Sequence, residues 1–170
     1  MDGFNLRHLA LAVALSAGMG SAFAATDNDF VDNAAAGGIA EIETSRLALE
    51  KSQSADIKAF ANQMITDHSK ANDELAAIAK ANDIEVPDTT TLVKQAKEKI
   101  LDMRDESFDA AYANNQVKAH EATIEIFEDE IKNGEDAELK AFATETLPKL
   151  KAHLVEAKKL AAAHGGAAAH

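Results

Sequence analysis

The sequence predicts an all-α domain made of four long helices. Alanine, leucine, lysine and glutamate dominate the composition, and both prolines, Pro87 and Pro148, lie in the second half of the chain. Apolar residues recur at intervals of three and four, the spacing at which a helix buries one face. The chain has no cysteine, which excludes disulfides, thiolate metal sites and a lipid anchor on cysteine.

The first 24 residues have the pattern of a secretory signal peptide. Arg7 and His8 precede the apolar run LALAVALSAGMGSAFA, which ends in the small-x-small sequence Ala22-Phe23-Ala24. The run is short and rich in small residues, which favours a cleaved signal over a membrane anchor. We therefore expect cleavage near Ala24/Ala25 and a mature protein that is periplasmic or otherwise exported.

The charge of the chain argues against two classes of partner. The net charge is −12, with one tyrosine and no tryptophan. Nucleic acids call for a basic surface and stacking aromatic residues, and anionic membranes call for a basic surface. We therefore expect no nucleic-acid binding and no strong membrane binding. The sequence leaves homo-oligomerisation open and identifies no protein partner.

Two long helices are expected in the first half of the mature chain. The first runs from about Asp27 to Lys51, with Thr26 or Asp27 as its N-cap, and Ser54 offers an N-cap for a second helix that extends to about Asn82. The second helix has one apolar face, formed by Ile57, Ala61, Met64, Ala71, Leu75 and Ile78.

A break and a third long helix follow. Pro87 and the run DTTT interrupt the helical pattern, and a short helix is expected at about 91–103. The third long helix is expected from about Glu106 to Asn133, with Gly134 as the residue that ends it.

The fourth long helix is expected from about Asp136 to Ala163. Pro148 lies inside it and is expected to kink the helix or open a bulge, because proline removes a backbone hydrogen bond. The sequence AHGGAAAH at the end of the chain predicts a disordered tail over 164–170.

A weak internal repeat indicates how the helices are connected. ADIKAFA (55–61) opens the second long helix and AELKAFA (137–143) opens the fourth. Two similar helical hairpins are thus expected, joined by a segment of about 83–105 that is long enough to cross the length of a bundle. Bundles with one such crossover are ferritin-like, so we predict a ferritin-like four-helix domain over 25–163.

Three histidines occupy apolar stripes. His68 falls between Met64 and Ala71 in the second helix, and His120 and His153 fall in the stripes of the third and fourth long helices. Each lies near the middle of its helix. Mid-helix positions meet at a similar level in a bundle, so we expect the three rings to converge.

The first helix contributes carboxylates instead of a histidine. Glu41 and Glu43 lie at its middle, about 200° apart around the helix, so both cannot point to the centre. The periodicity does not decide between them. Asp67, Asn72 and Glu121 are candidates to hold the imidazole rings in place.

Three imidazoles and a carboxylate in an apolar core could bind one zinc, iron, manganese or copper ion. The candidate ligands are His68, His120, His153, Glu41 and Glu43. The competing interpretation is a purely structural polar network, because a single buried histidine is usually satisfied by a local hydrogen bond.

The segments DNDFVDNAAAGGIAEIE, ANQMITDHSKANDEL, VKAHEATIEIFEDE and LKAFATETLPKLKAHLVEAKKL carry a family resemblance. Over about residues 28–162 the chain resembles the bacterial domain-of-unknown-function family 4142, whose members are often labelled outer membrane proteins. The resemblance implies a ferritin-like four-helix fold in the cell envelope and brings no established activity.

The sequence departs from the di-iron pattern of the wider ferritin-like class. That pattern places Glu three residues before His, whereas Ile65 precedes His68 and Leu150 precedes His153 at this spacing. Three hypotheses remain: a protein that binds one metal ion for buffering or stress tolerance, a metalloenzyme acting on oxygen species or a small substrate, and a structural or interaction bundle.

Overall fold

The computed structural model describes residues 23–100 and 108–165, with the side chains of 23–26, 95 and 98–100 left out. Within these ranges every regular element is a helix, as predicted: α1 (Phe23–Lys51), α2 (Ala55–Ala81), α3 (Thr89–Ile100), α4 (Phe108–Asn133) and α5 (Ala137–Ala163). Most of the expected signal segment lies outside the described residues. No helix in the described part is long and apolar enough to cross a membrane.

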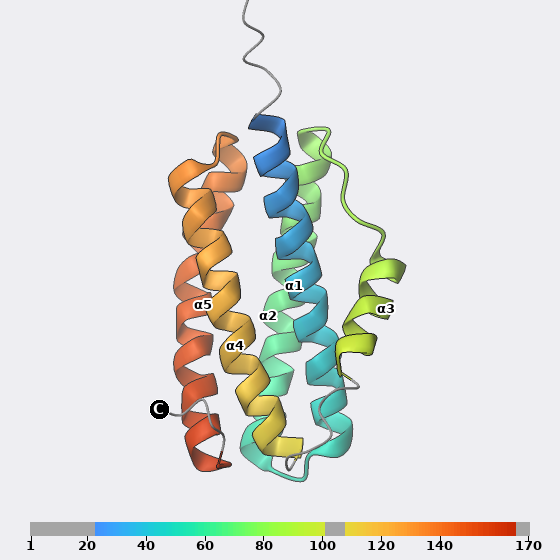
Figure 1. Cartoon of the computed structure of the whole chain (residues 1–170), viewed down its shortest axis with the longest axis vertical. Coiled ribbons are helices and arrows are strands. Elements are labelled where there is room, and N and C mark those ends of the chain that lie inside the picture. The colour runs from blue at the N-terminus through green and yellow to red at the C-terminus, as the bar shows by residue number, and fades with distance from the viewer. Residues whose placement is uncertain (1–22, 101–107, 166–170) are drawn as a thin grey trace, which may run out of the picture.

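The four long helices pack side by side as two antiparallel hairpins (Figure 1). α1 packs on α2, α4 packs on α5, and the hairpins meet through α1 against α4 and α2 against α5. The connection after α2 returns along the outside of α1, where the short α3 packs. As a result α2 and α4 run in the same direction, which is the course that the long connection predicts (Figure 1).

Two helix starts differ from the prediction. α1 begins at Phe23, so the expected cleavage site at Ala24/Ala25 lies in its first turn. α3 begins at Thr89, inside the run expected to interrupt the helices. The reason is Asp88, whose Oδ2 accepts hydrogen bonds from the backbone N–H and the hydroxyl of Thr91 at 3.1 and 3.2 Å. This side chain caps the first turn of α3.

α5 is continuously α-helical from Ala137 to Ala163, so Pro148 does not interrupt it; the kink expected at Pro148 stays a prediction. A proline at this position leaves the carbonyl of Thr144 without its helical donor. Both Thr144 and Pro148 are exposed, so water can satisfy that carbonyl and the helix continues. α5 begins close to the expected position, and Asp136 caps it by accepting from the N–H groups of Glu138 and Leu139 at 2.9 and 2.8 Å.

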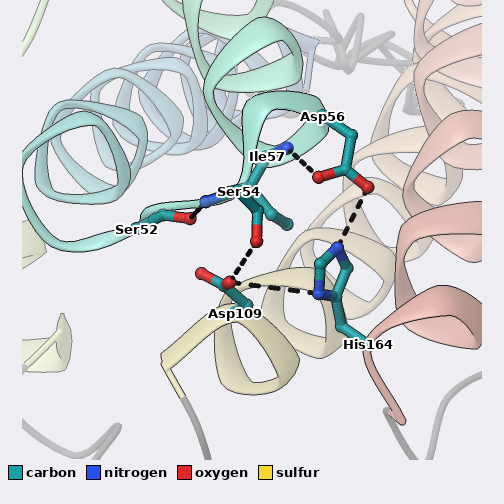
Figure 2. A network of polar contacts seen from close by, with 6 residues as sticks. All are labelled: Ser52, Ser54, Asp56, Ile57, Asp109 and His164. Atoms are coloured by element: carbon teal, nitrogen blue, oxygen red, sulfur yellow. Dashed lines mark hydrogen bonds and ion pairs between the residues drawn. The ribbon is translucent and has the colours of Figure 1, made fainter.

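A polar network joins three helix ends at one end of the bundle (Figure 2). Ser54 does not cap α2 with its side chain; its hydroxyl donates to Asp109 Oδ2 at 2.7 Å. His164 lies between Asp56 and Asp109, with Nε2 3.0 Å from Asp56 Oδ2 and Nδ1 3.9 Å from Asp109 Oδ2. His164 was expected to begin a disordered tail. These contacts fix it instead, while 166–170 lie outside the described residues.

The core consists of two apolar clusters. The Phe30 cluster contains, among others, Phe30, Val31, Leu75, Phe127, Leu139 and Phe142. The Tyr112 cluster contains, among others, Ile57, Phe60, Met64, Tyr112, Val117 and Ala157. The histidines lie between the two clusters along the bundle, since Val117 belongs to one and Ile124 to the other, and His120 falls between them in the sequence.

Candidate metal centre

The three predicted histidines converge in the middle of the core. His68, His120 and His153 are 7 %, 1 % and 1 % exposed. Their ring centroids are separated by 5.4 to 5.6 Å. Each ring offers one nitrogen, and these nitrogens lie within 4.8 Å of one another. Residues from three helices that are far apart in sequence therefore form one compact imidazole cluster.

Hydrogen bonds orient two of the rings. His120 Nδ1 lies 2.8 Å from the carbonyl oxygen of Gln116, one turn earlier in α4. His153 Nε2 lies 2.9 Å from Asp67 Oδ2, and Asp67 also accepts from Lys149 Nζ at 2.9 Å. Because a carbonyl and a carboxylate can only accept, His120 Nδ1 and His153 Nε2 are the protonated nitrogens.

The opposite nitrogens of these two rings each keep a free lone pair. His120 Nε2, His153 Nδ1 and His68 Nε2 are buried and have no hydrogen-bond partner. Buried polar atoms in proteins are normally hydrogen-bonded, so three unpaired nitrogens in one cluster require an explanation. A bond from each nitrogen to a shared ion would supply it.

Burial keeps these imidazoles neutral. Together, burial and the two neighbouring imidazoles lower the pKa of His68 to about 3. Burial and His153 lower the pKa of His120 to about 4, against an opposing effect of the hydrogen bond to the Gln116 carbonyl. Burial also lowers the pKa of His153, although the hydrogen bond to Asp67 opposes this shift. At neutral pH all three rings are uncharged, which is the form that binds a metal.

Neither predicted glutamate belongs to the group of side chains whose ligand atoms lie within 4.8 Å of one another. Glu43 forms ion pairs with Arg46 and, at 3.8 Å, with Lys97 Nζ on α3. Glu41 is 3 % exposed, and its Oε2 has no hydrogen-bond partner. Burial raises the pKa of Glu41 to about 8, with a smaller opposing effect from the adjacent Gln116, so its carboxyl is largely protonated at neutral pH.

Of the three candidates to hold the rings, Asp67 alone does so. Glu121 pairs with Lys158 at 2.9 Å, and Asn72 donates to the carbonyl of Ala35 at 3.4 Å. The Asn72 side chain lies against Gly38, where a Cβ would come within 2.2 Å of Asn72 Oδ1. Gly38 thus allows α1 and α2 to pack closely, which is an ordinary use of glycine.

Sequence reasoning missed Gln116. This side chain is fully buried, and its amide lies beside the Glu41 carboxyl, whose pKa it lowers. It extends the polar part of the core from the histidines toward Glu41. Ser45 and Tyr112, which share a buried hydrogen bond of 2.9 Å, continue it further. The available signal was the position of Gln116, four residues before His120 on the same helical face.

The comparisons with known proteins place the chain in a family. The family model described as domain of unknown function (DUF4142) matches residues 12–160. The chain belongs to the DUF4142 family. Searches of curated proteins and of solved structures gave no significant match. Membership confirms the resemblance seen in the sequence, and the function must be argued from the site.

Proposed function

We propose that this DUF4142 protein binds one transition-metal ion through His68, His120 and His153 in the cell envelope, for metal buffering or stress tolerance. The observation that carries the proposal is the set of three neutral imidazoles whose unpaired nitrogens are buried in one cluster. A purely structural network would give each nitrogen a local hydrogen-bond partner.

The geometry suits a four-coordinate ion. Metal–nitrogen bonds of about 2.0–2.1 Å in a tetrahedral site separate the ligand atoms by roughly 3.4 Å. The nitrogens lie within 4.8 Å, so small ring rotations would close the site. Imidazole ligands suit zinc, copper and iron, and manganese is the weakest fit because it prefers oxygen. Asp67 would orient His153 and increase its basicity.

The proposal also includes a ferritin-like fold and export from the cytoplasm. Two antiparallel hairpins joined by a long connection support a ferritin-like four-helix bundle. The signal pattern of the first 24 residues supports export. N-terminal sequencing of the periplasmic fraction should find Ala25 as the first residue. An intact Met1 in the cytoplasmic fraction would contradict export.

Metal titration of untagged protein tests the function. We expect one equivalent of Zn²⁺ or Cu²⁺ per chain for the wild type, and no stoichiometric binding for His68→Ala. His164→Ala is the matched control, because His164 lies at the end of the bundle and its ring contacts Asp56 and Asp109. Equal binding by the two variants would refute the assignment of the site.

A metalloenzyme acting on oxygen species or a small substrate is the second candidate. The observation that favours it is the number of ligands: three histidines leave the fourth position of a tetrahedral ion to water or a substrate, as in catalytic zinc sites. Azide added to the Co²⁺-loaded protein should change the visible spectrum if that position is exchangeable. An unchanged spectrum would favour buffering.

A further inference from the structure

A cavity of about 490 Å³ lies between α1 and α4, close to the end of α4. Asp29, Glu125, Asp129 and Glu130 contribute carboxylates to its lining, and Phe30 and Ile126 contribute apolar surface. None of the three clustered histidines lines it. We refer to it as the Glu130 cavity.

The lining of the Glu130 cavity contains acidic and no basic side chains. No lysine, arginine or histidine lines it. None of its four carboxylates forms an ion pair with any residue in the described ranges. The net charge of −12 adds to the local potential, which attracts cations.

Glu130 is an unusual member of this lining. It is 4 % exposed, and its Oε1 is buried without a hydrogen-bond partner. Burial and the nearby charges of Asp27 and Asp136 raise its pKa to about 7, while Lys140 opposes the shift. A buried carboxylate without a donor is costly, and a bound cation that donates a hydrogen bond would remove that cost.

Gly134 makes room for this carboxylate. A Cβ at position 134 would lie 2.1 Å from Glu130 Oε1 and 2.6 Å from the Glu130 backbone oxygen. The glycine does end α4 as predicted, but its φ is not positive. Its role here is therefore the absence of a side chain.

The lining distinguishes between kinds of cation. The carboxylates of the Glu130 cavity do not form a group of three whose oxygens lie within 4.8 Å of one another, so they do not converge as ligands of a single metal ion. Phe30 and Ile126 offer apolar contact beside the acids. This combination suits a cation with an apolar part.

We propose that the Glu130 cavity binds a primary amine cation with a short aliphatic stem. The ammonium group donates to Glu130 and Asp129, and the stem packs on Phe30 and Ile126. One oxygen of Asp129 already accepts from Asn133 Nδ2 at 2.6 Å, which holds the carboxylate in place. This site is separate from the proposed metal centre and does not depend on it.

Calorimetric titration of the full chain with 1-pentylamine at pH 8 tests the proposal. We expect saturable binding of one amine per chain, and much weaker binding of 1-pentanol, which has the same stem without the charge. Glu130→Gln should weaken amine binding about tenfold or more, because it removes a charge-assisted hydrogen bond. Glu145→Gln, an equal change of charge at an exposed position on α5, should leave the affinity unchanged.

A second variant displaces the Glu130 carboxylate without changing any charge, and its thermal unfolding shows whether it is folded. Gly134→Ala keeps every charge but displaces the Glu130 carboxylate, so it should also weaken amine binding. The proposal would be overturned by the absence of saturable binding to the wild type, by equal affinity for pentanol, or by unchanged affinity in Glu130→Gln. Displacement of the amine by Mg²⁺ beyond the effect of matched ionic strength would also overturn it, by showing a divalent-cation site.

Discussion

Two His–Asp pairs lie in different parts of the bundle, one in the core and one at its end, and their surroundings give them different roles. In the core, His153 lies 2.9 Å from Asp67, is 1 % exposed, and keeps its second nitrogen unpaired. At the end of the bundle, His164 lies 3.0 Å from Asp56 and faces Asp109 with its second nitrogen (Figure 2). The His153 ring thus keeps a free lone pair in the apolar core, whereas both nitrogens of His164 face carboxylates.

A His–Asp contact alone therefore does not indicate function. Both contacts have hydrogen-bond length, but Asp56 is about half exposed, so water screens the pair at the end of the bundle. The core pair is part of a cluster with two further neutral imidazoles. We therefore interpret the end network as a structural tie between helix ends and the core cluster as a ligand set.

The largest expected effect is the pH dependence of the unfolding free energy that arises from Glu41, a carboxyl buried in the core. The pKa of Glu41 is about 8 in the folded protein and about 4.5 in the unfolded chain. Between pH 4.5 and pH 8 the carboxyl is therefore protonated in the folded state and ionised in the unfolded state. Its stabilising contribution is present below pH 4.5 and is lost as pH rises through 8. Between pH 5 and 8, the metal-free wild type should lose on the order of 3 kcal/mol of unfolding free energy relative to Glu41→Gln.

Urea denaturation of both proteins at several pH values measures this difference. The histidines contribute equally to the two proteins, so their effect cancels in the subtraction. Parallel stability profiles for wild type and Glu41→Gln would show that the Glu41 carboxyl is not isolated in the core.

The next largest effect is the gain in stability on metal binding, which distinguishes His68 in the core from His164 at the end of the bundle. At a free metal concentration of 100 times the Kd, binding should stabilise the wild type by about 2.7 kcal/mol, seen as a rise in Tm of several degrees. His68→Ala should lose this rise, and His164→Ala should keep it. A rise that survives His68→Ala would place the metal elsewhere.

A smaller effect is expected from the residue that orients His153. Asp67→Asn should weaken metal binding by roughly 10- to 100-fold, because a partner that fixes the orientation and basicity of a ligand is lost. Glu121→Gln is the matched control, since Glu121 pairs with Lys158 on the outside of the bundle. Competition with a chelator of known affinity measures both variants. Equal Kd values would remove Asp67 from the site.

The smallest effect belongs to the end network. His164→Ala should lower the unfolding free energy by less than about 1 kcal/mol, since exposed ion pairs contribute little. Amide hydrogen exchange should increase at the end of α5 and the start of α2, with no change near the histidine cluster. Faster exchange throughout the core would mean that the network supports the whole fold.

The sequence predicted the histidine cluster because it rests on helical periodicity. His68, His120 and His153 continue apolar stripes, and residues on such stripes meet in the core. The same reasoning could not choose between Glu41 and Glu43, because both flank the buried arc of α1. That outcome depends on partners from other helices: Lys97 on α3 for Glu43 and Gln116 on α4 for Glu41.

Details of the fold can likewise be divided into those that depend on neighbours in the sequence and those that depend on partners from other helices. The helix boundary at Asp136 was predictable, because capping depends on neighbours in sequence. The start of α3 was predicted at about residue 91, two residues late, because the run DTTT favours a break, although Asp88 is an equally local cap. His164 was assigned to a tail because its partners, Asp56 and Asp109, are distant in sequence. Such contacts arise only from packing.

We propose that three specific nitrogens share one metal ion. Two-bond ¹H–¹⁵N spectra of the histidine rings, recorded with and without one equivalent of Zn²⁺, test it most directly. We expect the metal to shift His68 Nε2, His120 Nε2 and His153 Nδ1, the nitrogens without hydrogen-bond partners, and to leave His164 unchanged. Spectra that do not change with Zn²⁺, or that change at His164 alone, would contradict the claim.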